Sequence, residues 1–360
     1  MKLATFMMPL HPPGRSPADT LAEDREAILL ADRLGYCEAY VGEHVTDLAE
    51  NITSCLMFLA SLAHDTKNIV LGTGTINMPN GHPAAIAAQV AMLDHLLKGR
   101  FIMGISPGGL MSDAEVFGNF EKDRNAIFLE SINMVLDIWA KSSPYDLHGN
   151  FFHVSTAKTS IVEIGQGTII RPYQKPHPPI VVTAVAPHSK GVTEAAKRGW
   201  MPISANFLLP EWVATHWKKL VEGKPDAKPS DWRVAKSIFV ADDDKVAARY
   251  GHSADGPYHF YFKQLIRKLV GAGGRGNLFK LDQNQPDSEI TADVMTKKLV
   301  IAGTVDSVVD QILAFREKIG DFGTLLYPCH DWLDPALGRR SMELMAEKVM
   351  PRINAALKSS

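Results

Sequence analysis

The side chains that could do chemistry in this sequence gather directly after its short apolar segments. Four histidines occupy such positions, namely His11, His44, His188 and His330. Few lysines or arginines accompany them there. If these positions meet at one end of the fold, they form a neutral, histidine-lined cup with apolar walls. Such a cup suits a flat conjugated cofactor and an uncharged substrate better than it suits a sugar phosphate.

His44 is the strongest candidate for proton chemistry, because imidazole is the side chain whose ordinary pKa lies near neutral pH. It follows the apolar segment Glu38–Gly42 and stands next to Glu43. It either makes a structural hydrogen bond or belongs to an active site, and its position just beyond a strand favours the second role. His11, beside two prolines, either contacts a substrate or fixes its own loop, and His330 is structural or lines the pocket.

A metal centre is the less favoured use of these histidines. A metal site needs three or four converging ligands, and the four histidines show no local spacing such as H-x-x-x-H. We therefore expect no metal ion in the active site.

Two short motifs are candidates for holding a cofactor. Ala186-Pro187-His188-Ser189 opens a helix, where free N–H groups and the Ser189 hydroxyl form an anion site, although a plain helix cap explains the motif equally well. Thr73-Gly74-Thr75 is either an ordinary turn or a place where glycine lets the backbone approach a planar ring. A third motif, Gly271–Gly276, matches G-x-G-x-x-G but follows an apparent helix instead of a strand. We interpret it as a flexible hinge and expect no NAD(P)H site.

The elements that must position these residues alternate along the whole chain. Eight short segments are apolar at most positions, which is typical of parallel strands buried on both faces. The expected strands are Leu3–Met8, Glu38–Gly42, Ile69–Gly74, Phe101–Ile105, Ile180–Ala184, Met201–Ser204, Ala235–Val240 and Thr324–Tyr327. Strands separated by helices predict an α/β fold, a single (β/α)8 TIM barrel over residues 1–360. In that fold the residues that follow each strand meet at one end.

Helical patterns lie between the strands. Thr20 and Glu23 form a capping box before an apolar face that runs to Leu34. The other expected helices are Ala84–Leu97, Phe128–Trp139, Lys190–Arg198, Pro210–Val221, Val305–Lys318 and Ala336–Lys358. Two stretches, about 148–179 and 272–296, break the alternation and are rich in proline, glycine or polar residues. We expect both to be long loops, the second of them mobile.

Composition narrows the class of function. Of 360 residues, 46% are hydrophobic and 22% charged, and the formal net charge is −2. No basic stripe indicates a nucleic-acid partner, and no polybasic, amphipathic or long apolar segment indicates a membrane. The cysteines Cys37, Cys55 and Cys329 have no C-x-x-C spacing, so we expect free thiols and a cytoplasmic location.

Several segments, taken in this order, resemble the bacterial luciferase-like monooxygenase superfamily over nearly the whole chain. They are Tyr40–His44, Val70–Ile76, Pro79, His82–Pro83, Leu93–His95, Lys98–Phe101, Gly104–Ser106, Pro176–Ile180 and Gly303–Thr304. Within the superfamily the chain is most similar to the limonene and diketocamphane type of monooxygenase.

The resemblance implies a two-component enzyme. Its cofactor would be FMN, used in the reduced form FMNH2 and supplied by a separate NAD(P)H:flavin reductase. O2 would add to the ring as a 4a-(hydro)peroxyflavin, and one oxygen atom would pass to a small apolar substrate such as a terpenoid, ketone or aldehyde. The protein would keep water away from the reacting atoms. Relatives of this kind also imply a homodimer.

The resemblance assigns roles to particular residues. His44 matches a histidine that stabilises or deprotonates the oxygenated flavin. Gly74-Thr75 matches a non-proline cis peptide that packs on one face of the flavin ring, and Ser106 matches a residue near the reactive ring carbon. The segment that grips the phosphate is matched by Val185, Ala186 and Ser189.

One position departs from the pattern. Luciferases carry an arginine as phosphate partner where this chain has Pro107. The phosphate charge must then be met by backbone amides, Ser189, His188 or Arg124. For the substrate pocket we expect lining by His11, Asn77 and Trp332.

Two other functions stay open on the sequence. A deazaflavin-dependent oxidoreductase on the same barrel would transfer hydride without using O2. A non-catalytic flavin-binding partner subunit would share the fold without the reaction. The presence of His44 and Gly74-Thr75 argues against the second.

Overall fold

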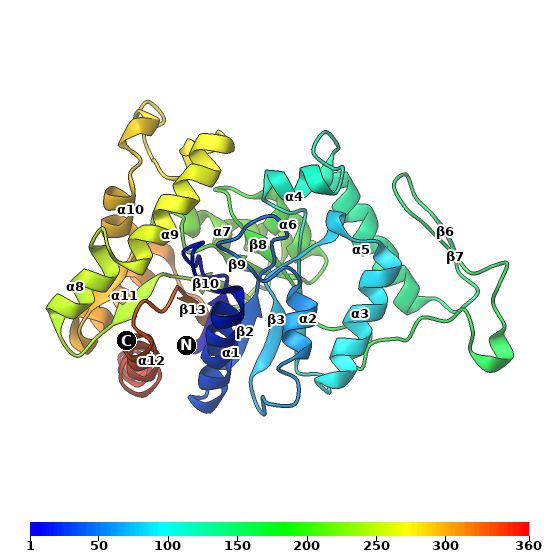
Figure 1. The fold of residues 1–360 in the computed structure, drawn as a ribbon, viewed down its shortest axis with the longest axis horizontal. Coiled ribbons are helices and arrows are strands. Elements are labelled where there is room, and N and C mark those ends of the chain that lie inside the picture. Colours follow the sequence, from blue (N-terminus) through cyan, green and yellow to red (C-terminus); the bar gives the residue numbers. More distant parts are fainter. Residues whose placement is uncertain (360) are drawn as a thin grey trace.

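Eight parallel strands close into a ring in the computed structural model, which describes residues 1–359 (Figure 1). In ring order they are β1 (Lys2–Met7), β2 (Glu38–Val41), β3 (Val70–Thr73), β5 (Phe101–Ser106), β8 (Ile180–Ala184), β9 (Met201–Ser204), β10 (Arg233–Ala235) and β13 (Thr324–Cys329). Pairing of β13 with β1 and of β3 with β5 closes the ring, and the two-residue β4 (Ile76–Asn77) continues beside β5. The predicted (β/α)8 barrel is confirmed.

Helices cover the outside of the ring. They are α1 (Pro17–Arg33), α2 (Cys55–Ala60), α3 (Pro83–Leu96), α4 (Met111–Val116), α5 (Arg124–Ala140), α6 (Lys190–Lys197), α7 (Pro210–Gly223), α8 (Asp244–His252), α9 (Pro257–Ile266), α10 (Ala292–Leu299), α11 (Val305–Ile319), α12 (Pro335–Leu344) and α13 (Met350–Ser359). Two π-helical segments, Arg267–Ala272 and Met345–Val349, continue α9 and α12. Among the described residues, no helix combines the length and apolar character needed to cross a membrane.

The barrel interior is filled with side chains rather than hollow. Its apolar layer consists of Ala4, Tyr40, Ile102, Val181, Ile203, Ala235 and Leu326. At the amino end of the strands, the Arg233 guanidinium donates two hydrogen bonds of 2.7 Å to Glu38, and the Tyr40 hydroxyl donates a third at 2.8 Å. Because this floor is closed and its charges are paired, we expect the barrel to receive a ligand from its carboxyl end.

Gly104 on β5 lets this strand approach the end of β3 more closely than any other residue would allow. A Cβ there would lie 1.8 Å from the carbonyl oxygen of Thr73, and the Thr73 hydroxyl already bonds both the N–H and the carbonyl of Gly104 at 2.7 Å. We expect Gly104→Ala to lower the free energy of unfolding by about 1–3 kcal/mol or more, because backbone must move to admit the methyl group. Urea unfolding measures this. Gly14→Ala, which meets no atom within 4 Å, is the control, and equal losses in both variants would contradict the explanation.

The seventh expected strand, Ala235–Val240, is wrong in its extent. β10 ends at Ala235, and β11 (Ile238–Val240) leaves the barrel to pair in parallel with β12 (Ile301–Gly303), a strand that was not predicted. Between them the carbonyl of Ser237 accepts a hydrogen bond of 2.9 Å from Ile301. The apolar pattern does not reveal this break, because the side chains are buried on both sides of it.

The first helix begins earlier than its capping box predicts. Its N-cap is Ser16, and Pro17 stands in the first turn, where its missing N–H costs nothing. The Thr20 hydroxyl caps nothing and instead donates to the carbonyls of Ser16 and Pro17.

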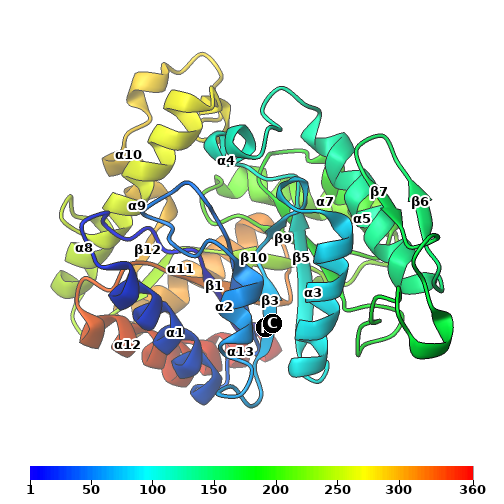
Figure 2. The same cartoon turned by 45° about the vertical axis from the view of Figure 1, so that its right-hand side comes forward.

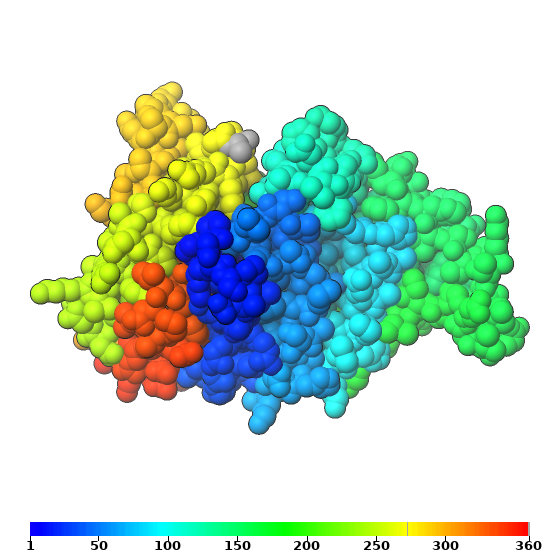
Figure 3. Space-filling view, in the orientation of Figure 1, coloured from blue at the N-terminus to red at the C-terminus, as the bar shows by residue number. Residues whose placement is uncertain are grey.

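The two expected long loops have different outcomes. The stretch 148–179 lies outside the barrel as predicted, and it begins with a hairpin of β6 (Asp146–His148) and β7 (His153–Ser155) that extends from the body (Figures 1 and 3). The stretch 272–296 is only partly loop, because it contains the start of α10, capped by Thr291 on the N–H of Val294. Helices α9 and α10 rise together at the same end of the molecule as α4 (Figure 2).

Candidate functional site

A cavity of about 730 Å³ opens at the carboxyl end of the barrel. The predicted site residues that line it are His44, Gly74, Thr75, Asn77, Ser106, Val185, Ala186 and Ser189. They follow β2, β3, β5 and β8, so the topology brings together residues that are up to 145 positions apart, from His44 to Ser189. In the space-filling view, a notch in the surface separates the blue-green segment that includes α4 from the yellow segment that includes α9 (Figure 3).

His44 is held between two carboxylates at one side of this cavity. Its Nδ1 lies 2.9 Å from Oδ2 of Asp113, and its Nε2 lies 3.6 Å from Oε2 of Glu50. The other oxygen of Asp113 accepts hydrogen bonds from the N–H and the hydroxyl of Thr46, at 2.9 and 2.6 Å. Asp113 therefore fixes the ring through Nδ1 and leaves Nε2 on the side of Glu50. Neither carboxylate was predicted, since both lie on loops or short helices without a motif.

The two carboxylates favour the charged form of His44. Burial alone lowers the pKa of His44, but the charge of Glu50 and the hydrogen bond to Asp113 outweigh it, so the pKa lies above its usual value. Burial raises the pKa of Asp113, and the hydrogen bonds from His44 and Thr46 bring it below its usual value. Both shifts favour the imidazolium–carboxylate form of this pair. In that form Nε2 carries a proton, because an imidazolium donates from both nitrogens.

Glu50 also connects His44 to the helices above the cavity. Its Oε1 accepts a hydrogen bond of 2.6 Å from Nζ of Lys268, and Lys268 forms a second ion pair with Asp47. Lys268 lies in the π-helical segment that continues α9. The Oε2 atom of Glu50 is buried and has no hydrogen-bond partner among the described residues. This ion pair fastens the segment after α9 to the loop that carries His44.

The wall beyond β3 is formed by the peptide between Gly74 and Thr75, which is cis as the resemblance implied. A Cβ on Gly74 would lie 2.9 Å from the ring of Phe6 and 3.0 Å from Cβ of Tyr40, so glycine is required here by packing within the protein. The Thr75 hydroxyl donates to Ser106 at 2.7 Å, and the Ser106 hydroxyl donates to Oδ1 of Asn77 at 3.1 Å. These hydroxyls form one ordered row along the wall.

A second part of the cavity wall is positively charged. Arg124 and Arg275 both line it, and their recorded hydrogen bonds are to neutral acceptors, including the carbonyls of Gly108 (3.1 Å) and Val185 (3.5 Å). Neither guanidinium forms an ion pair with a carboxylate within residues 1–359. Burial and the charge of Arg124 lower the pKa of Arg275. Two unpaired, mutually repelling cations indicate a site for an anion.

Ser189 lines the same cavity. It is the N-cap residue of α6, and its side chain makes no capping hydrogen bond, so its hydroxyl is available to a ligand. The free N–H groups at the start of α6 favour negative charge as well. Arg124 was predicted as one of several phosphate partners, whereas Arg275 was not. Arg275 lies within the glycine-rich run Gly271–Gly276, which we interpreted from the sequence as a flexible hinge.

A third region of the cavity is apolar and neutral. Burial lowers the pKa of His330 to about 3, so its ring is uncharged. That ring lies between Tyr258 and Tyr261, with ring centroids 4.3 and 4.5 Å away. Aliphatic and aromatic side chains supply the remaining surface there, among them Ile203, Phe207, Ala235 and Leu265. This end can hold an uncharged organic molecule.

Three sequence-predicted residues lie outside the cavity wall. Trp332 is buried, and its ring fills the space beside Gly338. His188 adopts a positive φ of 52° and turns its ring towards Trp212, with centroids 6.1 Å apart. His11 is 2% exposed and lies between Asp331 (2.6 Å) and Asp24 (3.1 Å). The pocket-lining interpretation of His11 and Trp332 is therefore replaced by a structural one.

The buried His11 cluster predicts a pH-dependent stability. Burial by itself lowers the pKa of His11, but Asp24 and Asp331 raise it from 6.5 to about 9. Because the folded pKa is the higher one, this stabilisation is complete below pH 6.5 and is lost as the pH rises through 9. Over that window we expect the free energy of unfolding to fall by up to about 3 kcal/mol. Urea unfolding between pH 6.5 and 9.5 measures it, and an equally steep fall in His11→Gln would contradict the assignment.

Comparison with known proteins identifies the family of this chain and several similar enzymes. The luciferase-like monooxygenase family matches residues 1–321 of the chain. The 4-hydroxyprotoasukamycin monooxygenase of Streptomyces nodosus subsp. asukaensis is 29% identical, over 99% of this chain and 93% of its own. Limonene 1,2-monooxygenase of Rhodococcus erythropolis is 26% identical, over 98% and 86%.

A solved structure extends the comparison to the fold. It is the oxygenating constituent of 3,6-diketocamphane monooxygenase from Pseudomonas putida, a type II Baeyer–Villiger monooxygenase in complex with FMN. It superposes with a TM-score of 0.86 at 26% identity and covers 98% of each chain.

Proposed function

Because the chain belongs to the luciferase-like monooxygenase family, we propose that it is the oxygenase component of a two-component flavin monooxygenase acting on small apolar carbonyl compounds. Its membership of the family and its similarity to monooxygenases over nearly the whole chain identify it as a flavin-dependent monooxygenase. The observation that carries the proposal is the polarity of one cavity. This cavity is lined by His44, which two carboxylates hold, and by Arg124 and Arg275, which form no ion pair within residues 1–359.

Reduced FMN fits the donor set of this cavity. The phosphate would be held by Arg124, Arg275 and Ser189, since these groups carry positive charge or a free hydroxyl. The flat ring would lie against Gly74-Thr75 and the hydroxyl of Ser106. Val185 and Ala186 would supply backbone beside the phosphate. When bound, reduced FMN supplies the two electrons that activate O2.

His44 directs this chemistry towards carbonyl substrates. An oxygen nucleophile that adds to a carbonyl carbon leaves negative charge on the carbonyl oxygen. The Nε2–H of a charged His44 can donate a hydrogen bond to such an oxygen, and Asp113 keeps the ring in position through Nδ1. A neutral pocket around His330, Phe207 and Leu265 suits an apolar ketone or an unsaturated ketone. The ketone-oxidising diketocamphane relative supports this choice.

The protein has a further task, which is to exclude water while the activated oxygen waits for its substrate. The ion pairs of Lys268 with Glu50 and Asp47 would hold the segment after α9 over the cavity. Since Glu50 also faces His44, closure of this segment and the charge of His44 would support each other.

The proposed partner is a separate NAD(P)H:flavin reductase. The run Gly271–Gly276, the one G-x-G-x-x-G match identified in the sequence, follows α9 rather than a strand, so it does not form a dinucleotide site. The solved relative is itself named as an oxygenating constituent, which supports a reductase on another chain. We also propose a homodimer and a cytoplasmic setting, as the resemblance to this family suggests.

An anaerobic titration tests the proposal against its two competitors. The protein should bind FMNH2 in preference to a reduced deazaflavin, and mixing the complex with O2 and a cyclic ketone should consume O2 and yield oxygenated product. Hydride transfer from reduced deazaflavin without O2 consumption would establish the deazaflavin-dependent alternative. Binding of FMNH2 without any oxygenated product across ketones, aldehydes and terpenes would favour the non-catalytic subunit.

A further inference from the structure

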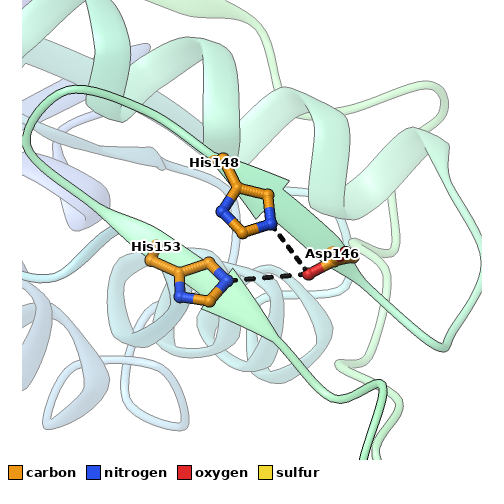
Figure 4. A group of neighbouring side chains, drawn as sticks. All are labelled: Asp146, His148 and His153. Atoms are coloured by element: carbon orange, nitrogen blue, oxygen red, sulfur yellow. Dashed lines mark hydrogen bonds and ion pairs between the residues drawn. The ribbon is translucent and has the colours of Figure 1, made fainter.

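We propose that the hairpin β6–β7 carries a divalent-cation site formed by Asp146, His148 and His153, and that Zn²⁺ is the ion its ligands suit best. The site lies outside the cavity and is independent of the flavin chemistry. Figure 4 shows the two imidazole rings directing a nitrogen each towards one carboxylate oxygen of Asp146. The three ligand atoms lie within 4.8 Å of one another.

The two distances from Asp146 to the histidines are close to those of an occupied zinc site. Oδ1 of Asp146 lies 3.1 Å from Nε2 of His148 and 3.6 Å from Nε2 of His153. In tetrahedral zinc sites the bonds to nitrogen and oxygen are about 2.0–2.1 Å, so neighbouring ligand atoms lie about 3.3 Å apart. Little movement would therefore be needed to admit the ion.

Strand geometry places the three ligands on one face. Asp146 and His148 are two residues apart on β6, and His153 lies directly opposite His148 on β7. Their rings stack with centroids 4.1 Å apart and an angle of 20° between their planes. Leu147 and Val154, which alternate with them, pack against the main hydrophobic core. The ligand face is exposed while the other face fixes the hairpin to the protein.

The turn between the strands is held in shape without any metal. The carboxylate of Glu130 on α5 accepts three backbone hydrogen bonds of 2.7–2.8 Å, from Asn150, Phe151 and Phe152. A Cβ on Gly149 would lie 2.2 Å from Oε1 of the same Glu130, so glycine is needed for this close approach. Because the turn is already ordered, little of the binding free energy of an ion would be lost in ordering its ligands.

In a second group of potential ligands, an arginine already balances the charge of the carboxylates. His11, Glu23 and Asp331 also lie within 4.8 Å of one another. There the Arg15 guanidinium already bonds both carboxylates, so the positive charge that an ion would bring is present. At the hairpin, no lysine or arginine among residues 1–359 forms an ion pair with Asp146, whose recorded ion-pair partners are the two histidines.

The ligand types select the ion. Two imidazoles and one carboxylate suit Zn²⁺ and related transition metals, whereas Mg²⁺ and Ca²⁺ prefer sites made of oxygen alone. Three protein ligands leave one position for water. An ion bound here links β6 to β7 beside the turn, so its expected effect is to stabilise the hairpin locally.

Calorimetric titration of the full-length, untagged, chelator-treated protein with ZnCl2 tests the site. The wild type should bind one Zn²⁺ per chain, MgCl2 should give no comparable heat, and the variant H148A/H153A should lose the Zn²⁺ signal. Asp146→Asn should weaken binding, and His64→Ala, which removes an exposed histidine elsewhere, should leave it unchanged. All of these side chains are exposed, so the variants should fold.

Amide hydrogen exchange of residues 146–155 provides a second readout. Zn²⁺ should slow exchange there in the wild type and in His64→Ala but not in H148A/H153A. Equal Zn²⁺ binding by the wild type and H148A/H153A, or no Zn²⁺ binding by the wild type, would overturn the proposal. Neither measurement involves flavin, so its result is separate from that of the proposed oxygenase function.

Discussion

Replacing His44 with alanine should leave FMN binding nearly unchanged and lower product formation by about 10²–10⁴-fold, the range for removal of a positioned proton donor. The side chain contacts Asp113 and Glu50, whereas Arg124 and Arg275 bond the carbonyls of Gly108 and Val185, so we expect the phosphate site to stay intact. Electrons delivered by FMNH2 should instead appear as hydrogen peroxide. The ratio of oxygenated product to NADH consumed, measured with a generic flavin reductase, reports this loss of coupling.

Two further variants separate the chemistry of His44 from its structural contribution. His44→Gln keeps a hydrogen-bond donor but cannot carry charge, so we expect it to form little oxygenated product per NADH consumed, as His44→Ala does. Asp113→Asn removes the partner that fixes Nδ1, and the pH at which coupling is lost should move down, because the pKa of His44 would fall. His64→Ala serves as the matched control. Normal coupling in His44→Ala and His44→Gln would remove this residue from the mechanism.

The second large effect concerns the anion site. Arg124→Ala and Arg275→Ala should each weaken FMN binding by about 10–100-fold, since a hydrogen bond to a charged group contributes about 1.5–3 kcal/mol. The double variant should bind more weakly than either single one. Riboflavin, which has no phosphate, should bind the wild type and the variants alike. Fluorescence quenching on titration with FMN and with riboflavin distinguishes the two cases.

The same titration can contradict the assignment of the two arginines to the phosphate. If riboflavin affinity fell as much as FMN affinity, the arginines would shape the cavity instead of holding the phosphate. Lysine at either position keeps the charge but not the paired N–H geometry, so it should restore only part of the FMN affinity.

Much of the fold was predictable because both faces of a barrel strand are buried. Segments such as Ile180–Ala184 and Met201–Ser204 are apolar at all but one position each, and their boundaries are confirmed. The pattern failed where a strand changes partner without changing burial, as between Ala235 and Ile238. It also failed at α10, whose start at Ala292 follows a polar stretch that resembles a loop.

The candidate site was predictable where residues follow strands directly. His44, Thr75 and Ser106 stand at or just beyond strand ends, and the barrel brings them to one cavity. Residues on longer loops could not be placed, because nothing local indicates which way they turn. Arg275 lines the cavity from such a loop and Asp113 contacts His44 from the short helix α4, whereas His11 follows β1 and turns away to meet Asp24.

The most direct measurement of the central claim is the fate of labelled oxygen. The protein, FMN, a flavin reductase and NADH are incubated under ¹⁸O2 with a panel of cyclic ketones, and products are analysed by mass spectrometry. We expect one ¹⁸O atom in each product molecule. When His44 is replaced by alanine, we expect only a trace of labelled product. Product without ¹⁸O, or product formed equally well in the absence of O2, would contradict the account.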